Sequence, residues 1–326
     1  MSMKMTMAQA LNACLSQEMA RDPNIILLGE DVGKDGGVFR VTEGLFDKYG
    51  KERVMDTPLA ESGIVGTSIG MAALGLRPVP EIQFDGFSFL AYHQVISHMA
   101  RMRNRTRGRF TLPMVLRIPY GGAIKALEHH GEAIETLYAH LPGLVVVTPS
   151  SPYEAKGLLA SALESKDPVV FLEPKRLYRA FKEEVPEERY TIPLGKARIA
   201  KEGKDISIIS YGSNTPMTLE TATELEKEGI NAEIVDLRTL NPCDWNTVTE
   251  SVKKTGRVVV VHEAVKTLGF GAEIIARINE KAFYHLVAQP RRVTSWDTII
   301  PLPETEKYFF PDVNRIKKAV IEVMRE

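Results

Sequence analysis

Residues 59–75 read LAESGIVGTSIGMAALG, and they combine one acidic residue with regularly spaced glycines. Pro58 disfavours a helical conformation for the residue before it, whereas Ser62 can cap a helix that runs through Ala73. Small residues recur on one face of this helix, at Gly63, Gly66, Gly70 and Ala73. Each glycine costs the helix about 1 kcal/mol relative to alanine. The repeated cost indicates that another backbone packs very close to this face.

One carboxylate, Glu61, lies at the entrance to this apolar, small-residue helix. The simpler interpretation is that it interacts with the positive end of the helix dipole, as acidic residues in a first turn commonly do. The functional interpretation is a carboxyl group in a dry interface that exchanges a proton with a nitrogen of a ligand. Spacing alone leaves both interpretations open, so the rest of the chain has to distinguish them.

Strands and helices alternate on both sides of this helix. Thr6 can cap an amphipathic helix, and the strand that follows at 25–29 is wholly apolar, as in a sheet that is buried on both faces. The pattern predicts strands at 25–29, 78–84, 114–118, 144–148 and 169–172, and helices at 7–21, 63–74, 87–102, 130–139 and 152–164. This alternation predicts an α/β fold with mostly parallel sheets and right-handed crossovers.

The alternation is interrupted between residues 173 and 193, where charged residues and prolines predominate. A second alternating set then follows. It predicts strands at 206–210, 231–236, 257–262 and 293–296, and helices at 215–228, 244–254, 271–282 and 312–324, the last capped by Asp312. We therefore predict two α/β domains, over residues 1–185 and 197–326, joined by a linker at 186–196.

Composition and charge restrict the classes of protein to which the chain can belong. Its 326 residues suffice for about two domains, and a charged content of 25% is ordinary for a soluble globular protein. A formal net charge of −1 gives no support to the binding of nucleic acid or of an anionic membrane. Cys14 and Cys243 are expected to be free thiols. Without an evident signal peptide or membrane helix, we expect a cytoplasmic protein, or one of the mitochondrial matrix or plastid if a transit peptide has been removed.

A glycine loop at 120–122 leads to paired histidines, His129 and His130, at the predicted start of a helix. The positive end of a helix destabilises an imidazolium, which favours a neutral imidazole that can exchange protons. Two histidines exposed at the surface are the competing interpretation. Nearby aromatic side chains are expected mostly in the core, although one of them could stack on an aromatic ligand; these are Phe84, Phe87, Phe89 and Tyr92.

Short motifs along nearly the whole chain resemble one known family. They read LGEDV at 28–32, GGVF at 36–39, TPLAESGI at 57–64, EIQF at 81–84, HLPGL at 140–144, DLRTL at 236–240 and HEA at 262–264. The family is the beta subunit of the thiamine-diphosphate-dependent decarboxylase component of 2-oxo acid dehydrogenase complexes. The stretch at 171–186 is most similar to the branched-chain 2-oxo acid type. The resemblance implies a pyrimidine-binding domain followed by a transketolase C-terminal-like domain.

The resemblance implies that thiamine diphosphate is held between this chain and an alpha subunit, in an α₂β₂ heterotetramer. The alpha subunit is expected to hold Mg²⁺ and the diphosphate, and this chain the aminopyrimidine ring, so that this chain alone is inactive. Glu61 falls at the family glutamate that hydrogen-bonds the pyrimidine N1′ and shares a proton with it. Further positions of the cofactor pocket are matched by Glu30, Leu59, Gln83 and Phe87.

The resemblance also implies roles outside the pyrimidine pocket. His130 falls at the family histidine that faces the substrate and the incoming lipoyl group, and a shift of one position would give this role to His129. A structural K⁺ site occurs in some relatives near Ala162, Ser165 and Asp167, and it uses mostly backbone carbonyls. The second domain is expected to offer a docking surface for the lipoyl acyltransferase component.

The implied reaction is the oxidative decarboxylation of a 2-oxo acid, followed by transfer of the acyl group to the lipoyl group. We favour branched-chain acids as the substrate, with pyruvate or acetoin as the nearest alternatives. A single-chain enzyme such as transketolase is disfavoured because the sequence lacks the magnesium–diphosphate motif. A non-catalytic scaffold subunit is the alternative from another class of protein, and the presence of both Glu61 and His130 argues against it.

Overall fold

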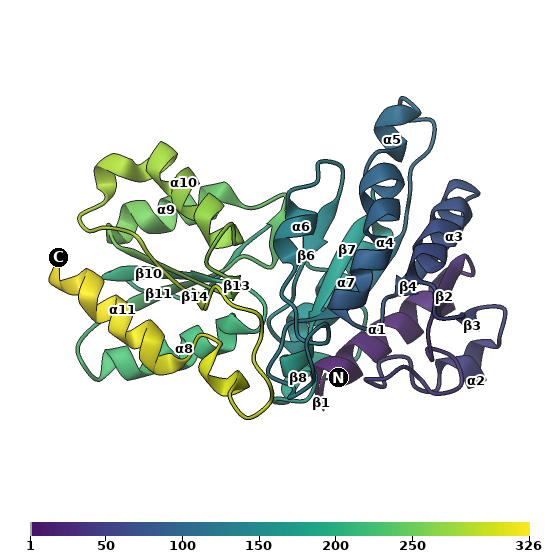
Figure 1. The fold of residues 1–326 in the computed structure, drawn as a ribbon, viewed down its shortest axis with the longest axis horizontal. Coiled ribbons are helices and arrows are strands. Elements are labelled where there is room, and N and C mark those ends of the chain that lie inside the picture. Colours follow the sequence, from purple (N-terminus) through teal and green to yellow (C-terminus); the bar gives the residue numbers. More distant parts are fainter. Residues whose placement is uncertain (1) are drawn as a thin grey trace. The chain divides into compact units, whose positions relative to one another are not determined.

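The computed structural model describes residues 2–326, which divide into two compact units (Figure 1). The first unit holds the residues up to Gly122 together with His129–Leu194. The second holds Ala123–Glu128 together with Gly195–Glu326. Each unit is a layered α/β structure with a mostly parallel sheet, so the predicted fold class is confirmed.

The sheet of the first unit sets the direction in which its loops leave. Its neighbouring strands are β6 (Val145–Val147), β7 (Val169–Pro174), β5 (Val115–Tyr120), β4 (Arg77–Glu81), β2 (Ile25–Gly29) and β3 (Val54–Asp56), in that order, and every pair is parallel. Strands β2, β5 and β7 are buried along their whole length, as apolar strands between two layers of helices are. The carboxyl ends of all these strands therefore meet at one edge of the sheet.

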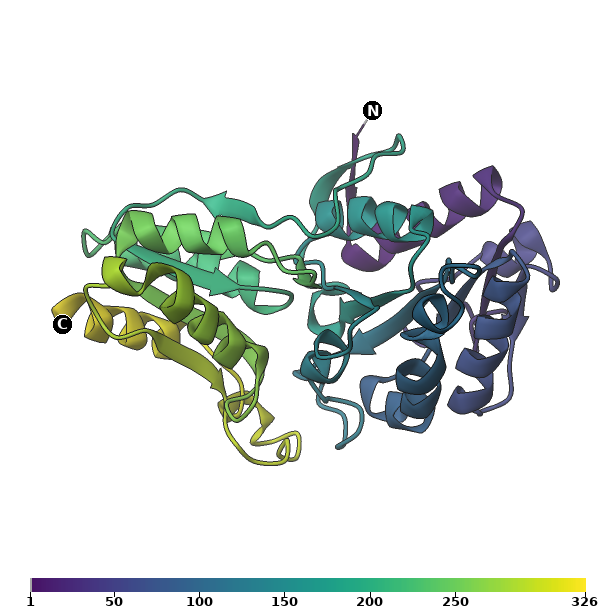
Figure 2. The same ribbon diagram turned by 90° about the horizontal axis from the view of Figure 1, so that it is seen from above.

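Helices cover both faces of this sheet. Helices α1 (Met7–Arg21) and α7 (Pro152–Glu164) pack together on one face, and α3 (Glu61–Ala73) and α4 (Ser88–Gln94) pack together on the other (Figure 2). Shorter helical pieces are α2 (Leu45–Tyr49), η1 (Asp85–Phe87), η2 (Val95–Met99), α5 (Met102–Arg105), α6 (Glu135–Ala139) and η3 (Lys175–Leu177). The core of this unit forms where α1 and α7 meet the apolar strands.

The second unit repeats this architecture. Its strands are, in order across the sheet, β14 (Arg291–Ser295), β13 (Val258–Val265), β10 (Ile206–Ser210), β11 (Ala232–Asp236) and the antiparallel edge strand β9 (Arg198–Lys201). Figure 1 shows α8 (Asn214–Glu226) and α11 (Val313–Arg325) on one face of this sheet, and α9 (Trp245–Thr255) and α10 (Phe270–Ala282) on the other. Shorter elements are β12 (Thr239–Asn241), η4 (Phe283–His285) and η5 (Glu306–Tyr308).

Three local predictions are wrong. The helix expected at 130–139 begins only at Glu135, because the carbonyl oxygens of His130 and Glu132 accept hydrogen bonds from Lys175 and Gly121 instead of from a following helical turn. The helix expected at 87–102 is interrupted by the π-helical turn η2. Ser62 does not cap α3, which begins at Glu61 and has Ala60 at its cap position without a capping side chain.

The charged stretch at 173–193 is more ordered than the expected linker. Its residues Glu183–Pro186 form strand β8, which pairs antiparallel with β1 at Ser2–Met5. Pairing between the first residues of the chain and a segment more than half the chain away is set by tertiary structure. A local pattern of charges and prolines could not reveal it.

Thr6 confirms its predicted role at the start of α1. Its hydroxyl accepts a hydrogen bond from the backbone N–H of Gln9, whose side chain in turn accepts from the backbone N–H of Thr6. We expect Thr6→Ala to lower the free energy of unfolding by about 1 kcal/mol, measured by urea denaturation. Thr223→Ala, at an exposed position inside α8, serves as the control and should leave stability unchanged or slightly higher. Equal stability of the Thr6 variant and the unaltered chain would contradict the expectation.

Within residues 2–326, no helix is both long enough and apolar enough to cross a membrane.

Candidate functional site

Four consecutive strands of the first sheet bring the predicted site residues to one edge. Glu61 lies at the start of α3, in the segment that leaves β3, and Glu30 follows directly after β2. Gln83 and Phe87 follow β4, and His130 lies in the loop that leaves β5. Because β3, β2, β4 and β5 are neighbours in this order, their exit segments lie side by side at the carboxyl edge. This edge is where ligands of open α/β sheets bind.

Two of these residues form a buried pair of carboxyl groups. Glu61 is 2% exposed and Glu30 is 7% exposed. Burial raises the pKa of the Glu30 carboxyl, and the charge of Glu61 raises it further. The Oε1 atom of Glu30 is buried without a hydrogen-bond partner, and neither carboxyl group has a cationic partner among residues 2–326. Such a pair is incomplete by itself, and a donor group on a ligand would satisfy it.

The raised pKa of Glu30 makes a prediction about stability and pH. The pKa of Glu30 is higher in the folded chain than in the unfolded chain. At pH values between these two pKa values the folded chain binds more protons, so the free energy of unfolding falls as the pH rises through this range. We expect Glu30→Gln to raise the melting temperature of the cofactor-free protein near pH 8, with a gain that shrinks toward pH 5. Differential scanning calorimetry measures it, with exposed Glu43→Gln as the control. A gain that is independent of pH would contradict this origin.

An aromatic cluster adjoins the carboxyl pair. The ring of Phe84 lies 5.5 Å from that of Phe87, and the His130 imidazole lies 4.6 Å from Phe84 and 5.1 Å from Phe87, all in edge-to-face geometry. Leu59, two residues before Glu61, is 76% exposed. The site therefore offers apolar surface beside its acidic groups, which suits a flat heterocyclic ligand.

The structure separates the two histidines that the sequence left ambiguous. His130 is half-buried and its ring packs into the aromatic cluster, whereas His129 is exposed. Neither lies at a helix N-terminus, because α6 begins only at Glu135, so the helix-dipole argument for a neutral imidazole is wrong. The geometry supports His130 as the histidine of the site through its packing instead.

Gln83, expected in the cofactor pocket, is already engaged within the chain. Its side-chain Nε2 donates to the carboxylate of Asp31 at 2.9 Å. Asp31 itself has a left-handed backbone with a φ of 58°, in the turn that follows β2 and Glu30. Gln83 therefore ties the segment after β4 to the segment after β2.

The structure also shows charged groups that sequence reasoning missed. Arg117, buried in β5, donates to Glu81 of β4 at 2.7 Å and to both carboxylate oxygens of Glu173 of β7, at 2.6 and 2.9 Å. Asp85 and Lys175 form a second buried ion pair at 3.0 Å. A charged residue inside an otherwise apolar, fully buried strand was the available signal, because such a charge requires a partner.

The glycine face of α3 does not meet a second backbone within the described chain. A side chain added at Gly66 would meet only the side chain of Gln94, at 3.6 Å, and one added at Gly70 would meet nothing within 4 Å. The close backbone expected from the sequence is therefore absent among residues 2–326. A contact of this face with another subunit stays a prediction.

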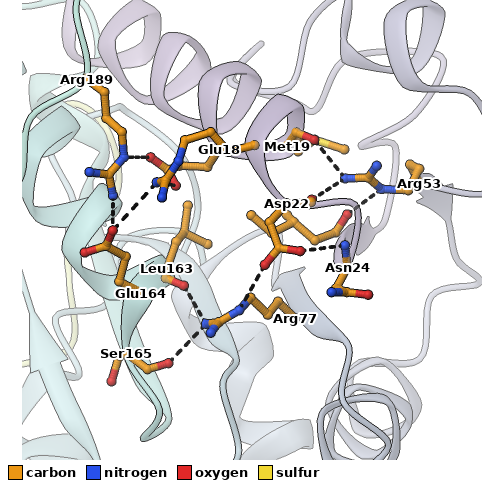
Figure 3. A network of polar contacts seen from close by, with 12 residues as sticks. Glu18, Met19, Asp22, Asn24, Arg53, Arg77, Leu163, Glu164, Ser165 and Arg189 are labelled. Carbon is orange, nitrogen blue, oxygen red and sulfur yellow. Dashed lines mark hydrogen bonds and ion pairs between the residues drawn. The ribbon is translucent and has the colours of Figure 1, made fainter.

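The predicted K⁺ site lies at the end of α7 (Figure 3). The carbonyl of Ala162 accepts from the Ser165 N–H at 3.1 Å, and that of Asp167 accepts from the Ser165 hydroxyl at 2.8 Å. The Arg77 guanidinium donates to the carbonyls of Ser165, at 3.3 Å, and Leu163, at 2.8 Å. Each carbonyl oxygen has two lone pairs, so these atoms can accept one bond and still face a cation. K⁺ at this place stays a prediction.

No group of three or more histidine, cysteine, aspartate or glutamate side chains within residues 2–326 is arranged to hold a metal ion. The Mg²⁺ that the resemblance assigns to an alpha subunit stays a prediction as well.

Comparisons with known families cover both units. Residues 3–180 match the family described as "Transketolase, pyrimidine binding domain". Residues 195–316 match the family described as "Transketolase, C-terminal domain". Both matches agree with the order of domains that the sequence resemblance implied.

Curated relatives match over nearly the whole length. The "Pyruvate dehydrogenase E1 component subunit beta" of Acholeplasma laidlawii is 55% identical over 311 residues, which cover 95% of each chain. The protein of the same description from Bacillus subtilis (strain 168) is 50% identical over 323 residues, covering 99% of this chain and 98% of the relative.

Among solved structures, a split-gene transketolase described as an inactive beta4 tetramer has a TM-score of 0.80. The similarity covers 98% of this chain and 99% of that one. Its sequence identity of 23% supports a shared fold alone.

Proposed function

This chain belongs to the transketolase-like E1 beta subunits of the 2-oxo acid dehydrogenases, and from that premise we propose that it forms the aminopyrimidine half of the active site of a pyruvate dehydrogenase. The family depends on thiamine diphosphate, and its beta subunits work with an alpha partner in a larger complex.

The buried carboxyl pair carries the proposal. Glu61 and Glu30 lie on neighbouring exit segments at the carboxyl edge of the sheet, and the charge of Glu61 acts on Glu30. Within residues 2–326, neither carboxyl group has a cationic partner, and Oε1 of Glu30 has no hydrogen-bond partner. An aminopyrimidine supplies a protonatable ring nitrogen and an amino group, which are the donors that such a pair lacks. The residues present therefore fit this part of the cofactor.

Thiamine diphosphate, when bound, supplies the electron sink for decarboxylation. Glu61 would share a proton with the pyrimidine N1′, and Glu30, whose pKa is raised by burial and by the charge of Glu61, would bind a proton more readily beside it. Phe87 and the exposed Leu59 provide apolar walls that exclude water once the cofactor and a partner cover them. His130, fixed among the aromatic rings, orients the lipoyl group or exchanges a proton with it during acyl transfer.

The relatives support pyruvate as the substrate, which is the alternative of the sequence analysis rather than its branched-chain interpretation. Relatives at 49–55% identity carry a pyruvate dehydrogenase description. Within the first unit, the stretch at 171–186 that favoured branched-chain acids forms buried strand β7 and the edge strand β8. Its residues Glu173 and Lys175 bind other groups of the same unit, so this stretch has a structural reason for its sequence.

We further propose that the working enzyme is an α₂β₂ heterotetramer in the cytoplasm, in which the alpha chain holds Mg²⁺ and the diphosphate. The open glycine face of α3 and the exposed Leu59 and Leu74 support a subunit contact on this side of the first unit. The acyltransferase component is proposed to dock on the second domain.

The test is dye reduction driven by 2-oxo acids, with this chain copurified with its alpha partner in the presence of thiamine diphosphate and Mg²⁺. We expect kcat/KM for pyruvate to exceed that for 3-methyl-2-oxobutanoate and 4-methyl-2-oxopentanoate by about tenfold or more. A preference for the branched acids would overturn the substrate and restore the original interpretation. No turnover of any acid, with partner and cofactor bound, would support a scaffold subunit instead.

A further inference from the structure

A buried lysine contacts the backbone of the segment that carries His130. Lys175 lies directly after β7, and its ammonium group donates to the carbonyl oxygen of His130 at 2.6 Å and to Oδ1 of Asp85 at 3.0 Å. The side chains of Lys175 and Asp85 are both completely buried. An ammonium group without solvent thus links the loop after β5 to the turn after β4.

Asp85 also binds the backbone at the start of the loop that carries His130. Its Oδ2 accepts from the backbone N–H of Gly121 at 2.8 Å, and its Oδ1 accepts from the N–H of Gly86 at 3.0 Å. Gly121 is the first residue after β5, where the histidine-bearing loop leaves the sheet. The Asp85–Lys175 pair therefore binds the loop both where it leaves β5 and at His130 itself.

Gly86 contacts the backbone of the same loop at His129. Its N–H donates to the carbonyl oxygen of His129 at 3.1 Å, and a Cβ atom at this position would lie 2.4 Å from that oxygen. The backbones of Gly86 and His129 are therefore in close approach, which only glycine permits. With both histidine carbonyls bound, the His130 side chain is directed toward Phe84 and Phe87.

The buried Asp85–Lys175 ion pair contributes more to the arrangement of the backbone around it than to the stability of the fold. Burial raises the pKa of Asp85 to about 7, and the neighbouring ammonium of Lys175 opposes that rise only in part. A buried ion pair of this kind contributes little net stability compared with apolar residues of the same volume. Its hydrogen bonds to the backbones of Gly86, Gly121 and His130 instead fix how these segments lie relative to one another.

We propose that the Asp85–Lys175 pair is a positioning device for His130: it fixes the backbone on which this imidazole is carried and so holds the ring against Phe84 and Phe87. The consequence for acyl transfer rests on the proposed function, whereas the orientation of the ring does not. Lys175 and Asp85 act through His130 and are not themselves catalytic residues.

Chemical modification of His130 tests the orientation directly. The rate of carbethoxylation by diethylpyrocarbonate is followed by peptide mass spectrometry in the chain assembled with its alpha partner. All variants carry His129→Asn, which removes the adjacent histidine and suits the left-handed backbone there. Lys175→Met removes the ammonium at similar length. Lys156→Met is the matched control, because that ammonium binds the carbonyls of Pro186, Glu187 and Glu188, away from this loop.

We expect His130 to react at least about fivefold faster in Lys175→Met than in the protein that carries His129→Asn alone, because its loop opens locally more often. In Lys156→Met the rate should equal that of the His129→Asn protein. The double variant Asp85→Asn/Lys175→Met leaves no unpaired charge of this pair, so we expect it to fold even where the single variant does not, and to show the same acceleration. Unchanged rates in the folded variants, or equal acceleration in the control, would overturn the proposal.

A second readout ties the device to acyl transfer. Lys175→Met should slow acetylation of the lipoyl group while the KM for pyruvate stays within about twofold, and adding it to His130→Ala should produce little further loss. Independent, multiplying losses would count against action through His130. Because carbethoxylation needs no substrate, an enzyme that fails to use pyruvate would leave the first test intact and would refute only the proposed function.

Discussion

Glu61→Gln is expected to lower the rate of pyruvate decarboxylation by about 10²–10⁴-fold, the range that removal of a proton-transferring side chain produces. Glutamine has the size of glutamate and keeps a hydrogen-bonding oxygen, so the pocket and the subunit contacts should persist. What it cannot do is share a proton with the pyrimidine nitrogen. Dye-coupled turnover at saturating thiamine diphosphate measures the loss, and gel filtration checks assembly with the alpha partner.

Glu154→Gln is the matched control for this experiment. Glu154 is also a buried glutamate in the first turn of a helix, α7, but this helix follows β6, which β7 separates from the four strands whose exit segments carry the site residues. If Glu61 served only to stabilise the start of α3, the two variants would lose similar stability and neither would lose activity. Normal turnover of Glu61→Gln would therefore decide for the helix-dipole interpretation and against proton transfer.

The second large effect is expected at His130. His130→Ala should slow acetylation of the lipoyl group by about 10²-fold, while dye-coupled decarboxylation falls by no more than about threefold. The reason is that the imidazole packs in the aromatic cluster, beside Phe87, whereas the carboxyl groups of Glu61 and Glu30, which are proposed to bind the cofactor, are unchanged in this variant. The two rates are compared with a free lipoyl domain as acceptor and with an artificial dye.

His129→Ala provides the control, because the neighbouring side chain is exposed and outside the aromatic cluster. Its two rates should both stay near those of the unaltered enzyme. Equal losses of both activities in His130→Ala would assign this histidine to decarboxylation or to folding. A selective loss in His129→Ala would transfer the role to that residue.

Periodicity was sufficient for most of the fold because the strands of both units are mostly apolar and alternate with helices. Thr6 caps α1, and Asp312 caps α11 through the N–H of Arg315, as their positions predict. The predictions were wrong where tertiary contacts override local preference. Strand β8 depends on a partner at the opposite end of its domain, and the histidine loop follows the left-handed backbone at His129 rather than a helical pattern.

The residues of the candidate site, too, could be predicted from the sequence only in part. Glu61 and Glu30 could be named from motifs, because both lie in short, recognisable stretches, and Glu30 also follows a predicted strand directly. The buried ion pairs of the first unit could not, because their contacts join distant parts of the chain. Lys175 and Asp85 are 90 residues apart, and Arg117 and Glu173 are 56 apart. A sequence shows that such buried charges need partners, but only the folded sheet shows which partners they find.

Proton uptake during cofactor binding tests the role of Glu61 most directly. Thiamine diphosphate is titrated into the assembled enzyme by isothermal titration calorimetry near pH 8, in two buffers of different ionisation enthalpy, which counts the protons taken up. A carboxyl group that shares a proton with the pyrimidine nitrogen should make this count larger in the unaltered enzyme than in Glu61→Gln, by close to one proton per site. Equal counts in the two proteins, with cofactor bound to both, would contradict proton sharing at Glu61.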